Sequence, residues 1–243
     1  MHAEAPATLI AGSHGGIGQA LLQTQLQRGP VISISRQPQP AQLTPPAGHV
    51  WQHIQADLSD PASVAAVQTQ LAEQPIARVF ACSGILHDAQ HQPEKSLSQL
   101  HSEWLLTSMR SNVLSHVHLA QALSKQVSKR SPVHWLSLSA KVGSIEDNGL
   151  GGWYSYRMSK AALNMWIKNL SIEWQRKSPD SIVAAVHPGT TDTELSKPFQ
   201  SRLAQDQLYS AELTAQRLSR VMDELSPAQH GKLLFWDGSI LPW

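Results

Sequence analysis

The sequence has little cysteine, little charge of either sign and no long apolar run. With one cysteine, Cys82, in 243 residues, the chain can form no internal disulfide, which fits a reducing compartment. The formal net charge of +1 gives no electrostatic reason to expect nucleic-acid binding. No apolar stretch approaches the ~18 residues that span a bilayer, and residues 1–6 lack the basic start of a signal peptide. We therefore expect a cytoplasmic chain without a membrane partner.

Short apolar runs alternate with helical patterns along the chain. Strands are expected at 8–11, 31–35, 50–56, 78–82, 133–139, 182–186 and 232–236, and helices over about 16–28, 59–73, 103–129, 155–177 and 211–225. Strands that are apolar throughout and separated by helices predict a doubly wound parallel sheet of seven strands in three α/β/α layers. Because we find no internal repeat and no linker, we expect residues 1–243 to form a single domain.

A glycine-rich loop, Gly12-x-x-x-Gly16-x-Gly18, lies between the first expected strand and the first expected helix. Glycines let a backbone turn tightly and approach a pyrophosphate, while the helix N-terminus supplies N–H groups and partial positive charge. This context predicts a Rossmann-type NAD(P)-binding domain, the alternative being a generic glycine turn. The cofactor contacts expected here are Gly12, Ser13, His14, Gly16, Ile17 and Gly18.

The end of the second expected strand distinguishes between the two nicotinamide cofactors. An NAD site usually has Asp or Glu there, whereas this strand ends in Ser35-Arg36 without an acid. Arg36 can pair with a 2′-phosphate, Ser35 can donate to it, and His14 is a weaker second cation. We therefore predict NADP(H) in preference to NAD(H), the alternative being that Arg36 is an ordinary solvated arginine. Asp57, followed by Leu58, is expected either to bond the adenine or to begin a helix.

Tyr156 and Lys160 lie four residues apart at the start of the expected helix 155–177. One helical turn places both side chains on the same face, where the ammonium is expected to lower the pKa of the phenol from about 10 toward working pH. Tyrosine and lysine have this spacing by chance in many helices. Combined with a phosphate-binding loop, however, the pair indicates a dehydrogenase.

Together these residues resemble the short-chain dehydrogenase/reductase family. The order and spacing of several features carry the resemblance: the loop 12–18, Asp57, Asn112, the region of Ser139, the Tyr156/Lys160 pair and the segment 188–193. The segments 142–145, 151–157 and 236–238 further resemble the C-factor, or C-signal-like, subgroup and its sniffer-type carbonyl reductase relatives. The resemblance covers nearly the whole chain.

The resemblance implies a mechanism. Tyr156 is then the general acid that protonates the carbonyl oxygen as NADPH delivers hydride, and Lys160 lowers its pKa and bonds the nicotinamide ribose. Asn112 holds a water in a proton relay, the alternative being a helix surface residue. The remaining implied cofactor contacts are Gly84 after the fourth strand and Pro188, Gly189, Thr190 and Thr193 after the sixth. Thr193 could instead cap a helix.

The chain departs from the family pattern at two positions near this site. Ala81-Cys82-Ser83-Gly84 stands where the family has Asn-Asn-Ala-Gly, so this turn needs other partners. Ala140 stands where the family has its carbonyl-polarising serine. Ser139 can replace that serine if the strand end bulges or twists, because it stays at the carboxyl end of the fifth strand. Ser144 is the second candidate, and a third alternative is that no serine has this role.

These features predict an NADP(H)-dependent oxidoreductase that reduces a carbonyl, or oxidises an alcohol, on a small organic substrate. The alternative is a nucleotide-binding regulatory or signalling protein of the C-factor type with weak or no turnover. We expect substrate choice to depend on loops 87–100 and 194–209, the second of which begins a substrate-loop and helix region, 194–225.

The two long helices, 103–129 and 155–177, resemble those by which family members form homodimers or homotetramers. No metal site is expected, because His87, Asp88 and His91 lie in a polar loop without another strong ligand. His116 and His118 are also discounted as a site, since residues two apart on a helix face different directions.

Overall fold

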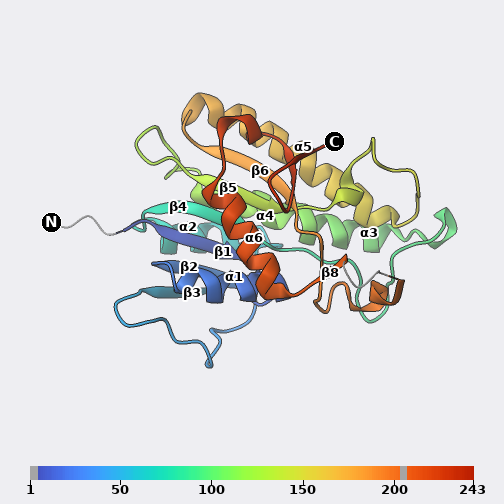
Figure 1. Ribbon diagram of the computed structural model, residues 1–243, viewed down its shortest axis with the longest axis horizontal. Helices are drawn as coiled ribbons and strands as arrows, with labels where there is room; N and C mark the ends of the chain where they lie inside the picture. Colours follow the sequence, from blue (N-terminus) through green and yellow to red (C-terminus); the bar gives the residue numbers. More distant parts are fainter. Residues whose placement is uncertain (1–4, 203–206) are drawn as a thin grey trace.

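The computed structural model describes residues 5–202 and 207–243, so residues 1–4 and part of the expected substrate loop, 203–206, lie outside the described residues. A twisted central sheet runs through the molecule (Figure 1). Its strands, in spatial order, are β3 (Trp51–Gln55), β2 (Val31–Ser35), β1 (Ala7–Ala11), β4 (Ile76–Ala81), β5 (His134–Leu138), β6 (Ile182–His187), β9 (Leu233–Phe235) and β10 (Ile240–Leu241).

The doubly wound α/β fold is confirmed, with one strand more than predicted. Every pairing from β3 to β9 is parallel, and all seven expected strands are present. The eighth strand, β10, pairs antiparallel with β9. It has two residues, which is too short to give a hydrophobic pattern.

Helices cover both faces of the sheet, as predicted. They are α1 (Gly16–Leu26), α2 (Ser63–Leu71), α3 (Ser102–Met109), α4 (Ser115–Leu123), α5 (Tyr154–Lys177) and α6 (Ala211–Asp223). α1 and α6 pack together on one face, around Leu22 and Leu218, whereas α2, α4 and α5 cover the other face, around Leu71, Leu119 and Leu163 (Figure 1). Among the described residues, no helix is long and apolar enough to cross a membrane.

The expected continuous helix 103–129 is wrong in two respects. A π-helical turn, η2 (Arg110–Leu114), interrupts it between α3 and α4. Such turns hold an extra residue and are frequent at functional sites. The helix also ends at Leu123, because the chain beyond it folds back so that Ser128 and Ser131 exchange backbone hydrogen bonds.

Candidate active site

The carboxyl ends of β1 to β4 surround a cavity of about 340 Å³. β1 is hydrogen-bonded to β2 on one side and to β4 on the other, so the strand order reverses here, where doubly wound folds bind ligands. Several predicted cofactor-binding residues line the cavity: Gly12, His14, Ser35, Arg36, Asp57, Leu58 and Gly84. A larger hollow, about 450 Å³, lies near the β9–β10 turn and shares no lining residue with this cavity.

The glycine loop has the close packing that a phosphate cradle requires. Gly12 has φ +76°, which favours glycine, and a Cβ there would lie 2.9 Å from the Ser83 nitrogen. A Cβ on Gly18 would lie 2.2 Å from the Gly12 carbonyl oxygen, so a side chain would force the turn open. The loop therefore fits a pyrophosphate at the start of α1. Ser13 is instead buried beneath the loop and donates to the Ile34 carbonyl at 3.3 Å.

Arg36 is exposed on the wall of the cavity. The neighbouring Ser35 hydroxyl donates to the Gln37 carbonyl at 2.9 Å and hydrogen-bonds His14 Nδ1 at 2.9 Å, so it is already engaged. Burial and the nearby His53 ring lower the pKa of His14, which makes this ring neutral at pH 7. Among the described residues that line the cavity, Arg36 is therefore the one permanent cation.

The loop after β3 has local partners of its own. Asp57 Oδ1 accepts from the backbone N–H of Ser59 at 2.9 Å and from its hydroxyl at 2.7 Å. These bonds stabilise a turn ahead of α2. Because α2 begins at Ser63, Asp57 lies in the approach to the helix and is not its N-cap residue. His118 Nδ1 donates to the Leu58 carbonyl at 2.7 Å and so fixes the loop from α4.

Asn112 lies in the π turn and is fully buried, so the alternative that it is a helix surface residue is wrong. Its Oδ1 accepts from the Ile85 N–H at 2.6 Å, and its Nδ2 donates to the Ile85 carbonyl and the Ser159 hydroxyl, both at 2.9 Å. A Cβ on Gly84 would lie 3.0 Å from Asn112 Oδ1 and 3.4 Å from Lys160 Nζ. The two polar side chains therefore converge beside Gly84.

Tyr156 and Lys160 lie in the first two turns of α5, with the ammonium 5.7 Å from the centroid of the phenol ring. Lys160 donates to the Leu138 carbonyl at 2.8 Å, and burial lowers the pKa of its ammonium to about 8. Burial raises the pKa of the Tyr156 phenol, so the predicted decrease is wrong. Loss of water around a phenolate outweighs attraction by an ammonium that is hydrogen-bonded elsewhere. The phenol is thus protonated at neutral pH, as a general acid must be.

The two candidate serines are both buried and both hydrogen-bonded. The Ser139 hydroxyl donates to Asn164 Oδ1 at 2.6 Å, and Asn164 Nδ2 donates to the Gly143 carbonyl at 3.3 Å, which ties the end of β5 to α5. Ser144 Oγ accepts from the Asp147 N–H at 3.1 Å. A hydroxyl that polarises a carbonyl must donate to it, so Ser139 would first have to leave Asn164. Its role stays a prediction.

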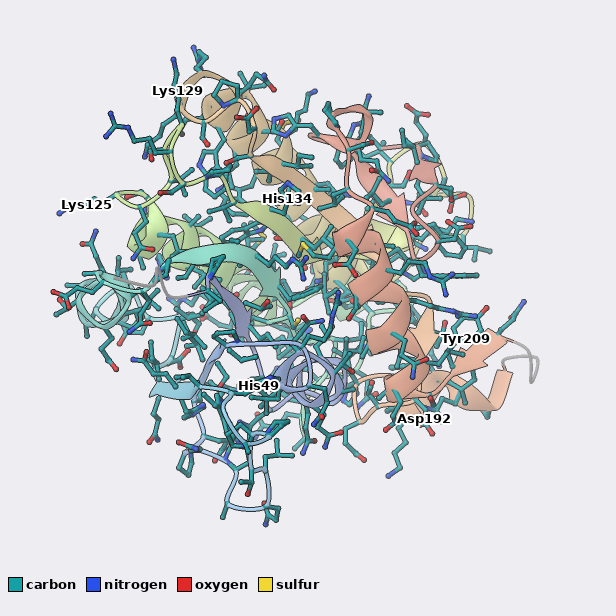
Figure 2. The ribbon with its side chains drawn as sticks, turned by 60° about the vertical axis from the view of Figure 1, so that its left-hand side comes forward. His49, Lys125, Lys129, His134, Asp192 and Tyr209 are labelled. Carbon is teal, nitrogen blue, oxygen red and sulfur yellow. The ribbon has the colours of Figure 1, made fainter. Side chains whose placement is uncertain are left out.

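The segment after β6 approaches the glycine loop. Gly189 has φ +79°, and a Cβ there would lie 2.9 Å from the Tyr209 ring. Thr190 and Thr191 form β7, which pairs with β8 (Leu208–Tyr209). Figure 2 shows Tyr209 and Asp192 near each other at the edge of the molecule. Thr193 packs directly on Gly16. The structure therefore brings the 188–193 segment and the loop 12–18 together, as a shared cofactor site requires.

His116, which the sequence analysis discounted, supports the turn that lacks the family's asparagines. Its Nε2 donates to the Ser83 carbonyl at 3.0 Å, and its Nδ1 accepts from the Ser137 hydroxyl at 3.0 Å. Ser137 in turn accepts from Trp135 Nε1 at 2.8 Å. Burial lowers the pKa of His116 to about 3, which matches a neutral ring with one donor and one acceptor. The two-residue spacing of His116 and His118 could not predict these contacts, because each ring supports a different loop.

Residues 6–204 match the family model described as short chain dehydrogenase. The C-signal protein of Myxococcus xanthus is 33% identical over 107 residues, which cover 44% of this chain and 58% of that protein's length. The 1-hydroxy-2-glutathionyl-2-methyl-3-butene dehydrogenase of Rhodococcus sp. (strain AD45) is 25% identical over 237 residues, covering 97% of this chain and 98% of that enzyme. The predicted resemblance to dehydrogenases and to C-signal is thus confirmed.

Solved structures have the same fold. The NADPH-bound carbonyl reductase from chicken fatty liver superposes with a TM-score of 0.79 at 21% identity, covering 99% of this chain and 100% of that one. The carbonyl reductase Sniffer of D. melanogaster gives 0.77 at 19% identity with the same coverage. At such low identities the likeness establishes the fold and leaves substrate and residue roles to the chemistry of the site.

Proposed function

The chain belongs to the short chain dehydrogenase family, and on that premise we propose that it is an NADPH-dependent reductase of small carbonyl compounds. Membership makes it an NAD(P)-dependent oxidoreductase. The observation that carries the proposal is the convergence of Asn112 and Lys160 beside Gly84, which also lines the cavity below the glycine loop. Asn112 and Lys160 therefore lie next to a residue that lines the same cavity as the phosphate cradle.

The cofactor would lie along this cavity. Gly12, Gly16 and Gly18 would hold its pyrophosphate at the start of α1, and Arg36 would bind the 2′-phosphate through charge-assisted hydrogen bonds. Pro188 to Thr190 would contact the nicotinamide end. When bound, the reduced nicotinamide supplies a hydride. The absence of an acid at the end of β2 supports NADPH over NADH.

Tyr156 would donate a proton to the carbonyl oxygen of the substrate, because its phenol stays protonated at neutral pH. Lys160 would place a positive charge near that phenol and restore its proton through a water that Asn112 would help to hold. Asn112 donates to the Ser159 hydroxyl, which in turn donates to the Tyr156 carbonyl, and these two bonds would hold the relay against the first turn of α5.

Aromatic rings flank Tyr156 on the side of the expected substrate loops. Trp153 lies 6.2 Å from the Tyr156 ring and 5.1 Å from the Phe199 ring, measured between centroids. His87 lies 5.9 Å from Phe199 and hydrogen-bonds the Leu195 carbonyl at 3.1 Å, so it joins the two loops. We infer that this wall favours a carbonyl compound with a flat apolar group, since such rings stack well.

The test is NADPH oxidation by the purified protein with matched aromatic and aliphatic aldehydes, ketones and quinones. Tyr156→Phe should lose at least ~10²-fold in turnover while it retains the fold and NADPH binding, as expected for removal of a positioned acid. Tyr154→Phe is the matched control and should remain active. Full turnover by Tyr156→Phe would assign the acid to another residue.

We also propose that the chain forms a homodimer or homotetramer. Met158, Met165 and Ile172 are exposed on α5 at seven-residue spacing, which places them on nearly the same helix face. Met165→Glu should therefore lower the mass measured by light scattering. The signalling alternative has less support, because the dehydrogenase relative aligns over nearly its whole length.

A further inference from the structure

The helix that carries Tyr156 and Lys160 begins without a cap of its own. Its N-cap residue is Trp153, which has no side-chain acceptor, and its first turn contains no acidic residue. The first N–H groups of a helix have no partner within the helix, and their partial positive charge favours a carboxylate. A 24-residue helix that positions a reacting group therefore needs a partner from elsewhere in the chain.

Glu94 supplies that partner from the loop between β4 and α3. Its two carboxylate oxygens accept from the Ser155 N–H at 3.3 and 3.2 Å, and one also accepts from the Ser155 hydroxyl. The Glu94 side chain is 2% exposed, and within the described residues it makes no ion pair. A buried carboxylate is costly unless it is well hydrogen-bonded, and within residues 5–202 and 207–243 Glu94 is compensated by the start of α5 rather than by a cation.

The backbone of Glu94 fixes the residue that starts the helix. Gly151, Gly152 and Trp153 have φ values of +64°, +65° and +52°, so three successive residues are left-handed. For a bulky residue such as Trp153 this conformation is strained and persists only when its surroundings hold it. The Trp153 N–H donates to the Glu94 carbonyl at 2.5 Å, and a Cβ on Gly152 would lie 3.2 Å from that oxygen.

We propose that Glu94 is a positioning residue that aligns the Tyr156 acid from the substrate loop. Its carboxylate holds Ser155, the residue before Tyr156, while its carbonyl holds Trp153, whose ring flanks Tyr156. The expected substrate loop and the helix that carries the proposed acid are thereby joined at one residue. This inference rests on the proposed role of Tyr156 as the proton donor.

The first test compares Glu94→Ala with Glu103→Ala. Glu103 is an exposed first-turn acid of α3, so its removal changes the same charge at another helix start. Glu94→Ala should lower kcat about 10-fold or more, the scale expected from a small misplacement of a reacting group, while its Kd for NADPH changes little. Glu103→Ala should leave both unchanged. Equal kcat in Glu94→Ala and the unmutated protein would overturn the proposal.

Glu94→Gln keeps an acceptor for Ser155 but loses the charge, so its kcat should lie between those of Glu94→Ala and the unmutated protein. If Glu94→Ala fails to fold, Glu94→Gln replaces it in every comparison, and kcat within error of the unmutated value then overturns the proposal. A parallel loss of kcat and NADPH affinity would also overturn it, because it would indicate a general structural role.

The second test places Glu94→Ala in the Tyr156→Phe background. A residue that acts through Tyr156 has nothing left to align there, so the double variant should turn over no more slowly than Tyr156→Phe. The same fold-loss in both backgrounds would overturn the proposal. If Tyr156→Phe itself keeps full turnover, Tyr156 is not the acid and the proposed function fails. If Tyr156→Phe loses turnover but Glu94→Ala does not, only the positioning role of Glu94 fails.

Discussion

Gly16 and Thr193 touch across the two halves of the sheet: a Cβ on Gly16 would lie 2.4 Å from Thr193 Cγ2 and 2.9 Å from its Cβ. Gly16 is the first residue of α1, and Thr193 follows the β7 strand. The contact leaves no room for a side chain at position 16. It joins the proposed pyrophosphate cradle to the segment proposed to hold the nicotinamide.

We expect Gly16→Ala to weaken NADPH binding by about tenfold or more, since a shift of either segment costs charge-assisted contacts to phosphate. Thr193→Ser removes the methyl group that the new Cβ meets. The double variant Gly16→Ala/Thr193→Ser should therefore bind NADPH more tightly than Gly16→Ala alone, measured by fluorescence titration. Gly29→Ala is the control, because a Cβ there meets nothing within 4 Å. An unchanged NADPH affinity in Gly16→Ala would show that Thr193 can shift without affecting cofactor binding.

Strand and helix positions could be predicted because the buried strands consist mostly of apolar residues, as in Ala7–Ala11 and Ile182–His187. The π turn at Arg110–Leu114 could not. It adds a residue to a helical pattern without changing composition, and its stabilising partner, Ile85, is distant in sequence. The strand β10 was missed because two residues carry no period.

We expect cofactor choice to depend on Arg36. The exposed guanidinium lines the cavity beside a strand end without an acid, so the unmutated protein should bind NADPH at least about 10-fold more tightly than NADH. Arg36→Ala should remove most of this preference while NADH affinity stays the same. Arg130→Ala, which changes an exposed arginine away from the cavity lining, should alter neither value. Equal affinities for the two cofactors before mutation would refute the assignment.

The sequence predicted the parts of the site that carry motifs and missed those that support them. Gly12, Lys160 and Asn112 have recognisable spacing or a family equivalent. Glu94 and His116 act on segments distant in sequence, through hydrogen bonds that leave no periodic trace. The direction of the Tyr156 pKa shift was also missed, because the degree of burial depends on packing that spacing alone does not specify.

The serine assignment makes a prediction with two arms. If Ser139 polarises the substrate carbonyl, Ser139→Ala should lower kcat by more than it weakens NADPH binding, since the donor acts on charge that develops in the transition state. Ser139 also ties β5 to α5 through Asn164, so Asn164→Ala serves as the control for loss of that contact. A kcat loss confined to Ser139→Ala supports polarisation, whereas equal losses in both variants indicate positioning.

Ser144→Ala should have the smaller effect, and the reverse order would move the role to Ser144. Ala140→Ser restores a hydroxyl at the position that the family uses. If neither serine matters and Ala140→Ser raises kcat, the natural chain is a weakened reductase. All four variants can be compared by initial rates of NADPH oxidation at saturating cofactor.

The last prediction concerns acid stability and His116. Burial lowers the pKa of this ring to about 3, whereas in the unfolded chain the pKa returns to about 6.5. Between these values the unfolded state binds a proton that the native state excludes, so the free energy of unfolding should fall as the pH falls from about 6.5. One such group contributes a slope of up to about 1.4 kcal/mol per pH unit. His187, whose pKa burial lowers to about 4, acts in the same direction.

His116→Gln removes one of these protons but retains a side chain that can bond the Ser83 carbonyl. Urea unfolding at pH 7, 6, 5 and 4.5 should therefore give a variant that is less stable at pH 7 yet loses stability more slowly on acidification. The exposed His101→Gln variant should follow the unmutated curve. Parallel curves for His116→Gln and the unmutated protein would mean that His116 is charged in the native state. The donor–acceptor chain from Trp135 to Ser83 would then need a different assignment, because a doubly protonated ring could not accept from Ser137.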